Sequence, residues 1–234
     1  MNLINNLLKD INQERNENKS LILQKFFKTQ KGQYGYGDIF LGITVPIQRK
    51  IAKKYQDINL SDIQKLITKK IHEYRLISLL ILILKYQKSK LKKDQKRIYD
   101  FYVKNINFIN NWDLVDLSAP HIIGNYLLDR SRRSLYNLAK SPDLWHRRIS
   151  IISTFTFIKK QDFTDTLKIA QILLNDEHDL IHKATGWMLR EVGKRDISTL
   201  YRFLDKFCTK MPRTMLRYSL EKLPKDKKKY YMTL

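Results

Sequence analysis

Cysteine, glycine and proline are scarce in this sequence, and each shortage excludes a class of structure. A single cysteine, Cys208, excludes a disulfide framework, indicates a reducing compartment and is interpreted here as a core residue. Seven glycines and five prolines in 234 residues leave few sites for turns, so helices should dominate. No apolar run approaches the ~20 residues of a membrane span. The longest, 76–84, is interrupted by Ser78 and predicts a buried helix.

Motifs for several chemistries are absent as well. The sequence contains no HExxH, CxxC or GxSxG, and its histidines lack convergent ligand spacing beyond His178 and His182, a pair interpreted as surface residues. We therefore expect no metal and no cofactor. The segment 1–6 lacks a basic region followed by an apolar run, so we expect no secretory signal and a cytoplasmic protein.

Positive charge is what the sequence has in excess. Lys and Arg number 45 against 23 Asp and Glu, a net charge of +22 that is spread from end to end. A spread excess predicts a broad electropositive surface for a polyanionic partner, rather than a basic tail. The many aromatic residues exclude a disordered basic linker.

Apolar residues recur at three- and four-residue spacing, as at Ile63, Leu66 and Ile67, which predicts an all-α protein. Helix starts are indicated at Ser61-Asp62, at Ser141-Pro142-Asp143 and at Asn175-Asp176. The predicted helices are 2–14, 20–31, 47–55, 61–69, 72–88, 93–105, 112–118, 120–128, 131–139, 144–159, 163–174, 178–193, 196–207 and 212–222.

Helix pairs of roughly 30–40 residues are typical of helical repeats. The stretches 144–174 and 178–207 each have that form. They favour a single domain over 1–234, an α-solenoid of HEAT-like repeats with a concave basic DNA-binding face and a basic end at about 225–234. A compact all-α bundle is the alternative, and a monomer is the simplest expectation.

The predicted helix 178–193 carries a tryptophan among cations. Ile181, Ala184, Thr185, Met188 and Val192 should face the core. On the opposite side we expect the indole and the cations that would bind a sugar or base and the DNA phosphates, namely Trp187, Lys183, Arg190 and Lys194. The alternative is an amphipathic tryptophan packed on a neighbouring repeat.

A second tryptophan stands four residues before a carboxylate. If 112–118 is helical, Trp112 and Asp116 share one side, opposite Leu114 and Leu117. A carboxylate repels phosphate, so Asp116 in so basic a protein suggests a chemical role, with a salt bridge to a basic neighbour as the alternative. Asp113 is interpreted as a helix cap.

A buried arginine and a glycine-rich turn complete the candidates. Arg148 falls among apolar positions of the predicted helix 144–159 and therefore requires an anion, either Asp116, a DNA phosphate or a purely structural partner. Arg147 lies nearer the edge. The turn 32–38 lacks the lysine and spacing of a P-loop, so we interpret it as a tight connection whose Tyr34 or Tyr36 touches the ligand.

At these residues the chain resembles the DNA alkylation repair family, the AlkD-like alkylpurine DNA glycosylases built from HEAT-like repeats. The resemblance rests on Phe40-Leu-Gly-Ile-Thr-Val-Pro46, Asn111-Trp-Asp-Leu-Val-Asp116, Trp145-His-Arg-Arg148 and Lys183-Ala-Thr-Gly-Trp-Met-Leu-Arg-Glu191. It implies that Asp116 is the active-site aspartate, that Trp112 and Trp187 are the paired indoles, and that Arg148 contacts DNA beside the lesion. Thr44, a candidate DNA contact, stands where members carry a larger polar residue.

The resemblance implies a glycosylase that hydrolyses the N-glycosidic bond of N3- or N7-alkylated purines in duplex DNA without flipping the base. Asp116 would stabilise the cationic sugar and position water, and no lysine nucleophile is indicated, which favours a monofunctional enzyme. Arg147, Lys183, Arg190 and Lys194 are the candidate phosphate contacts. The alternatives are a non-enzymatic HEAT-repeat protein that binds damaged or branched DNA and a scaffold for acidic partners.

Overall fold

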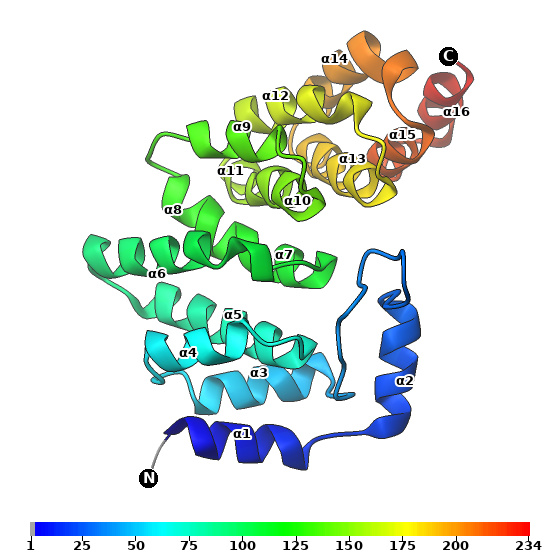
Figure 1. Ribbon diagram of the computed structural model, residues 1–234. Helices are drawn as coiled ribbons and strands as arrows, with labels where there is room; N and C mark the ends of the chain where they lie inside the picture. Colours follow the sequence, from blue (N-terminus) through cyan, green and yellow to red (C-terminus); the bar gives the residue numbers. More distant parts are fainter. Residues whose placement is uncertain (1–2) are drawn as a thin grey trace. The chain divides into compact units, whose positions relative to one another are not determined.

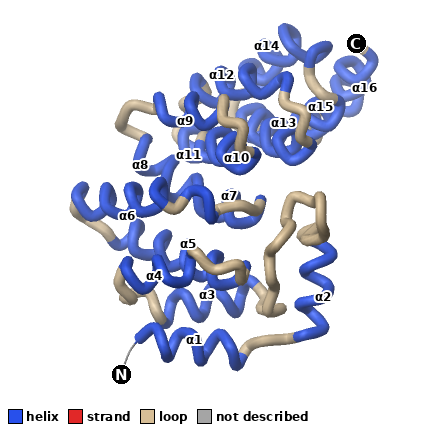
Figure 2. The backbone as a smooth tube through the Cα atoms, viewed as in Figure 1, coloured by secondary structure: helices blue, strands red, loops and turns tan. Residues whose placement is uncertain are grey.

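The computed structural model describes residues 3–234, and its contacts divide the chain into two compact units. The first unit ends at Ser118 and the second begins at Ala119. Within the described residues, strand-type pairing is limited to one isolated bridge between Ile39 and Ile71, and helices make up both units (Figure 1, Figure 2). The prediction of an all-α fold of helical repeats is confirmed. The single domain and its concave face stay predictions.

The helices of the first unit are α1 (Leu3–Gln13), α2 (Glu17–Phe26), α3 (Val45–Lys54), α4 (Leu60–Ile67), α5 (His72–Lys88), α6 (Lys92–Lys104) and α7 (Trp112–Ala119), with a 3-10 turn at Ile106–Phe108. Helix α5, which contains the apolar run 76–84, is buried over most of its length and packs against α3, α4 and α6. Figure 1 shows α2 set apart from these layered helices, and Figure 2 shows the connection from α2 to α3 as loop.

The second unit opens with a π-helical turn at Pro120–Gly124 and continues with α8 (Asn125–Leu127), α9 (Arg133–Ala139), α10 (Leu144–Ser153), α11 (Phe155–Lys159), α12 (Thr164–Ile172), α13 (Asp179–Gly193), α14 (Ile197–Phe207), α15 (Arg213–Leu220) and α16 (Lys225–Thr233), with 3-10 turns at Leu173–Asn175 and Cys208–Lys210. Helix α13 is its central element and packs against α10, α12, α14 and α15. Cys208 is buried, as predicted.

Of the three helix starts that the sequence indicates, one is confirmed. Asp143 caps α10 by accepting from the backbone N–H of Trp145 at 2.8 Å, as predicted. Ser61-Asp62 lies inside α4, whose cap is Asn59, which accepts from the Asp62 N–H at 2.8 Å. The cap of α13 is His178, however, and Asn175-Asp176 lies before it. Helix α16 was not predicted, because its run of lysines lacks an apolar stripe. The predicted start of the first helix, at residue 2, lies outside the described residues.

Among residues 3–234, no helix combines the length and the apolar character that a membrane crossing requires.

Candidate functional site

Helix α7 carries Trp112 and Asp116 one turn apart. Residues four apart lie on the same side of a helix, and both of these side chains are half-buried, whereas Leu114 is fully buried. The charge of Asp116 also acts on Tyr102. Burial raises the pKa of Tyr102, the negative charge of Asp116 raises it further, and the hydrogen bond with Ser118 lowers it. The helix predicted at 112–118 is therefore present, and it offers an indole beside a carboxylate.

Two phenylalanines, which no sequence pattern singles out, hold the indole of Trp112. Its ring stacks on Phe27, with centroids 5.2 Å apart, and meets the edge of Phe26 at 6.0 Å. Phe27 in turn stacks on Phe40 at 4.9 Å. Both supporting rings come from the end of α2 and the residue after it, so this isolated helix has a packing role at the site.

A buried polar network lies at the start of α7. His72, the first residue of α5, places Nε2 2.8 Å from Asp113 Oδ2 and Nδ1 3.3 Å from Asp38 Oδ2. Asn111 also donates to Asp38 Oδ2, at 3.3 Å. Burial alone would lower the pKa of His72, but the charge and hydrogen bond of Asp113, with the bond to Asp38, raise it to about 9. Asp113 is thus a network residue, and its interpretation as a simple cap was incomplete.

Thr44 and Tyr34, the predicted DNA contacts of the first unit, lie in the segment before α3. Thr44 precedes α3 without a side-chain capping bond and lines a cavity of about 250 Å³ together with Phe27 and His72. Tyr34 is half-buried, with the Lys28 ammonium 6.0 Å from its ring centroid. Tyr36 is 64% exposed. Positive φ at glycines 32 and 37 agrees with the predicted tight connection.

Helix α13 carries the predicted aromatic and cationic residues of the second unit. All five residues expected to face the core are buried, while Trp187 is half-buried against Phe155, with ring centroids 6.0 Å apart. Each predicted phosphate-binding cation of this helix is paired with a carboxylate: Lys183 with Asp179 at 2.7 Å, Lys194 with Glu191 at 2.5 Å, and Arg190 with Glu221. A phosphate would have to compete with these carboxylates for the same cations.

The two arginines of α10 differ in environment. Arg148 is only 5% exposed, as its place on the helical wheel predicts, and its Nη1 donates to the Leu180 carbonyl at 2.5 Å. Arg147 is half-buried, with Nε 2.6 Å from Asp176 Oδ2 and Nη1 donating to the Pro142 carbonyl at 2.8 Å. Arg147 therefore ties the start of α10 to the turn before α13.

Two histidines at that turn correct an expectation. The sequence predicts His178 and His182 at the surface, whereas both are half-buried. His178 Nδ1 accepts from the Leu180 N–H at 3.1 Å, and His182 contacts the Asp176 carbonyl. Burial lowers the pKa of His178. Their spacing of four therefore reflects local packing at the start of α13.

A protein-family model described as DNA alkylation repair enzyme matches residues 7–223. The chain belongs to this family. Membership supports a role in the repair of alkylated DNA and confirms the resemblance seen in the motifs around Trp112, Arg148 and Trp187. The matched residues span both units and end before α16.

A solved structure from Enterococcus faecalis supports the same fold for this DNA alkylation repair family member. That protein, described as a predicted DNA alkylation repair enzyme, matches with a TM-score of 0.69 and 16% sequence identity, over 91% of this chain and 98% of its own. At this identity the likeness establishes the fold alone. A search of curated proteins found no significant match.

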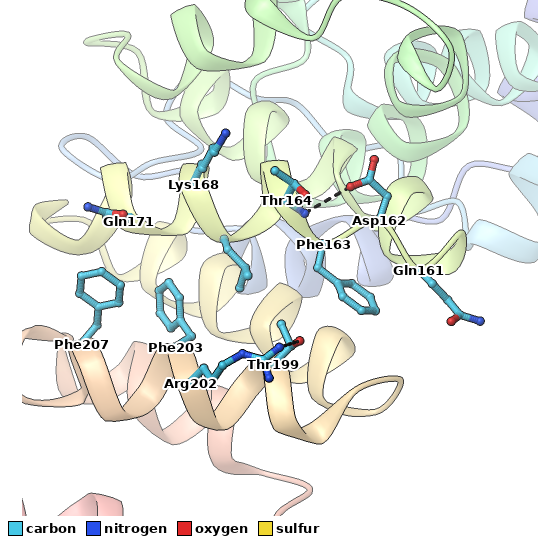
Figure 3. Close-up of a pocket in the computed structure, with 11 residues that line it drawn as sticks. Gln161, Asp162, Phe163, Thr164, Lys168, Gln171, Thr199, Arg202, Phe203 and Phe207 are labelled. Carbon is cyan, nitrogen blue, oxygen red and sulfur yellow. Dashed lines mark hydrogen bonds between the residues drawn. The ribbon is translucent and has the colours of Figure 1, made fainter.

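The DNA alkylation repair protein also has a hollow of about 450 Å³ between α12 and α14. Figure 3 shows Phe163, Phe203 and Phe207 at its apolar side, with Lys168 and Arg202 also lining it. Arg202 is engaged locally, donating to Thr199 Oγ1 at 2.6 Å. The lining includes none of the predicted site residues, so the hollow stands apart from the candidate site.

Proposed function

We propose that this protein is a monofunctional alkylpurine DNA glycosylase. Its substrate is an N3- or N7-alkylated purine in double-stranded DNA, which it releases without base flipping, acting as a monomer and without a cofactor. The observation that carries the proposal is the pair formed by Trp112 and Asp116 on one side of α7, in a chain that belongs to the DNA alkylation repair family.

The proposed chemistry mainly requires a negative charge beside the deoxyribose of the alkylated nucleotide. An alkylated purine is cationic, so it leaves with the electrons of its glycosidic bond as a neutral base while positive charge develops on the deoxyribose. The carboxylate of Asp116 stabilises that charge and accepts a proton from the water that attacks C1′. The Trp112 ring adds attraction for the sugar cation through its quadrupole. One such electrostatic interaction supplies on the order of 3–4 kcal/mol.

The second unit supplies the remaining proposed contacts. Trp187 is the second aromatic residue at the sugar, and Arg148 is the DNA contact beside the lesion. Arg147, Lys183, Arg190 and Lys194 bind backbone phosphates by exchanging their present carboxylate partners for phosphate oxygens. Tyr34 and Thr44 contribute contacts from the first unit.

Asp116→Asn tests the proposal, because it removes the charge and keeps the shape. Single-turnover release of free base from a duplex containing N7-methylguanine should fall on the order of 10²–10³-fold. Binding to the same duplex should be unchanged or stronger, since a charge that repels phosphate is gone. Released base is measured by liquid chromatography.

Asp57→Asn is the matched control, because Asp57 is an exposed carboxylate of the same unit and the chemical change is identical. This variant should release base at the parent rate. Duplex binding without base release by the parent, on N7-methylguanine and on N3-methyladenine, would refute the enzyme and favour the non-enzymatic DNA binder.

A further inference from the structure

His72 is buried between two carboxylates, and its hydrogen bonds define its charge. The side chain is 2% exposed, and each ring nitrogen faces a carboxylate oxygen, of Asp38 on one side and of Asp113 on the other. An ionised carboxylate only accepts hydrogen bonds, and a neutral imidazole has one donor nitrogen. Both contacts are satisfied together only when both nitrogens carry a proton, so the geometry requires an imidazolium.

The charges of the cluster formed by His72, Asp38, Asp113 and Arg75 also favour a protonated His72. Asp38 and Asp113 bring two negative charges, and Arg75, whose Nη2 lies 2.7 Å from Asp38 Oδ1, brings one positive charge. Protonated His72 completes the balance inside the protein, where an uncompensated charge is strongly destabilising. Glu73, also buried, is satisfied separately by the backbone N–H groups of residues 41–43.

This cluster bonds to the residues immediately before and after Trp112 in the first turn of α7. Asp113 follows the tryptophan and bonds His72, while Asn111 precedes it and donates to Asp38. The backbone holds Asp38 in place, because the Ile39 N–H donates to the Lys70 carbonyl at 3.0 Å and the His72 N–H donates to the Ile39 carbonyl at 2.9 Å. The beginnings of α5 and α7 are thereby locked together.

A stack of rings makes a second connection from His72 to the indole. The imidazole stacks on Phe40 with centroids 4.4 Å apart, Phe40 stacks on Phe27, and Phe27 stacks on Trp112. Trp112 is thus restrained both through the backbone of α7 and through its own ring. Asp116 lies one helical turn further along α7. Any rotation of α7 therefore moves Trp112 and Asp116 together.

We propose that protonated His72 is a positioning residue that fixes the orientation of Trp112 and, through α7, of Asp116. Its effect on base release rests on the proposed glycosylase function, whereas its effect on the orientation of Trp112 does not. His72 itself is buried, so its influence reaches the substrate through other residues.

Fluorine NMR of protein labelled with 5-fluorotryptophan tests the positioning directly, since the chain has three tryptophans. Each resonance is assigned by a Trp→Phe variant. In His72→Gln, which keeps a donor and loses the charge, the Trp112 resonance should shift or broaden while those of Trp145 and Trp187 stay in place. His146→Gln, the same change at a half-buried histidine of the second unit, should leave Trp112 unaffected.

Base release gives the functional half of the test. His72→Gln should lower the single-turnover rate on the order of 10-fold or more at unchanged duplex affinity, because a small misplacement of catalytic groups slows chemistry more than binding. His72→Arg restores a cation with several donors, and the adjoining cavity of about 250 Å³ offers space for the longer side chain. This variant should recover both the Trp112 resonance and the rate.

The outcomes separate the inference from the proposed function. An unchanged Trp112 resonance in His72→Gln, or an equal shift of all three resonances, would overturn the positioning role. A selective Trp112 shift in a protein that releases no base would support positioning and refute the glycosylase. Should His72→Gln fail to fold, ¹⁵N NMR of the unaltered protein at pH 8 decides, because one unprotonated nitrogen on His72 would overturn the proposal.

Discussion

The protonated state of His72 links the stability of the first unit to pH. Burial opposes the charge, but Asp113 and Asp38 raise the folded-state pKa of His72 to about 9, above the ordinary 6.5 of the unfolded chain. Protonation of His72 therefore stabilises the folded state, fully at pH values below the pKa of the unfolded chain. This stabilisation is lost as the pH rises through the pKa of the folded protein. The window is therefore about pH 6.5 to 9, and the shift corresponds to about 3 kcal/mol.

Urea unfolding across this window measures the effect. The free energy of unfolding of the wild-type protein should fall from pH 6.5 to pH 9, whereas His72→Gln should give a flatter profile. The charged groups that face His72 are Asp38, Asp113 and Arg75. Burial raises the pKa of Asp38, but its interactions with His72 and Arg75 outweigh burial and hold that pKa below its usual range, so Asp38 keeps its charge in this window. Parallel profiles for the two proteins would contradict the assignment.

Some residues of the candidate site can be predicted from the sequence, and others cannot. Trp112 and Asp116 are four residues apart, so helical periodicity alone places them together. Arg148 is conspicuous because a guanidinium falls among apolar positions. His72 lies 34 residues from Asp38 and 41 from Asp113, and only the tertiary fold brings these three side chains into contact.

Helices α13 and α15 pack closely together, and their packing depends on Gly186. A Cβ on this glycine would lie 2.4 Å from the Met215 carbonyl oxygen and 2.6 Å from Tyr218 Cβ. Gly186→Ala would gain about 1 kcal/mol of helix propensity, but overpacking against a backbone atom costs about 1–3 kcal/mol. We expect a net loss of up to about 2 kcal/mol in unfolding free energy. Base release should also be slower, since Trp187 is the next residue.

Gly193→Ala is the matched control for this prediction. It lies on the same helix, and its Cβ would meet Leu200 Cδ2 at 2.4 Å, the end of a flexible side chain that can turn away. Chemical denaturation should therefore show the smaller loss for Gly193→Ala. Equal or greater stability of Gly186→Ala would mean that α13 and α15 tolerate separation.

The elements themselves were predictable to the extent that their apolar residues are periodic. Helix α5, with its continuous buried run, and the start of α10, with Asp143 as its cap, follow from the sequence alone. The predicted helix 144–159 is divided at Thr154 into α10 and α11. Helix α16 does not, because it is held by Tyr231, which is buried, donates to Asp205 at 2.7 Å and stacks on Tyr201. A single anchoring residue among lysines leaves no periodic signal.

For the molecule as a whole, the net charge of +22 predicts a strong dependence of DNA affinity on salt. Each phosphate neutralised by a lysine or arginine contributes about −0.9 to the slope of log K against log salt. The proposed DNA contacts include five cations, Arg147, Arg148, Lys183, Arg190 and Lys194. If each neutralises one phosphate, the slope is about −4.5, or a loss of affinity of about 500-fold between about 50 and 200 mM salt. Fluorescence anisotropy of an undamaged labelled duplex measures this slope.

A single substitution distinguishes specific phosphate contacts from the diffuse charge of the surface. Lys183→Gln should reduce the magnitude of the slope by about 0.9, because one contact is lost. Lys93→Gln removes the same charge from an exposed position at the start of α6 and should leave the slope nearly unchanged. Asp116→Asn should also keep the slope, since it alters no phosphate contact. If Lys183→Gln and Lys93→Gln changed the slope equally, binding would follow net charge alone, and the assignment of Lys183 to a phosphate would be wrong.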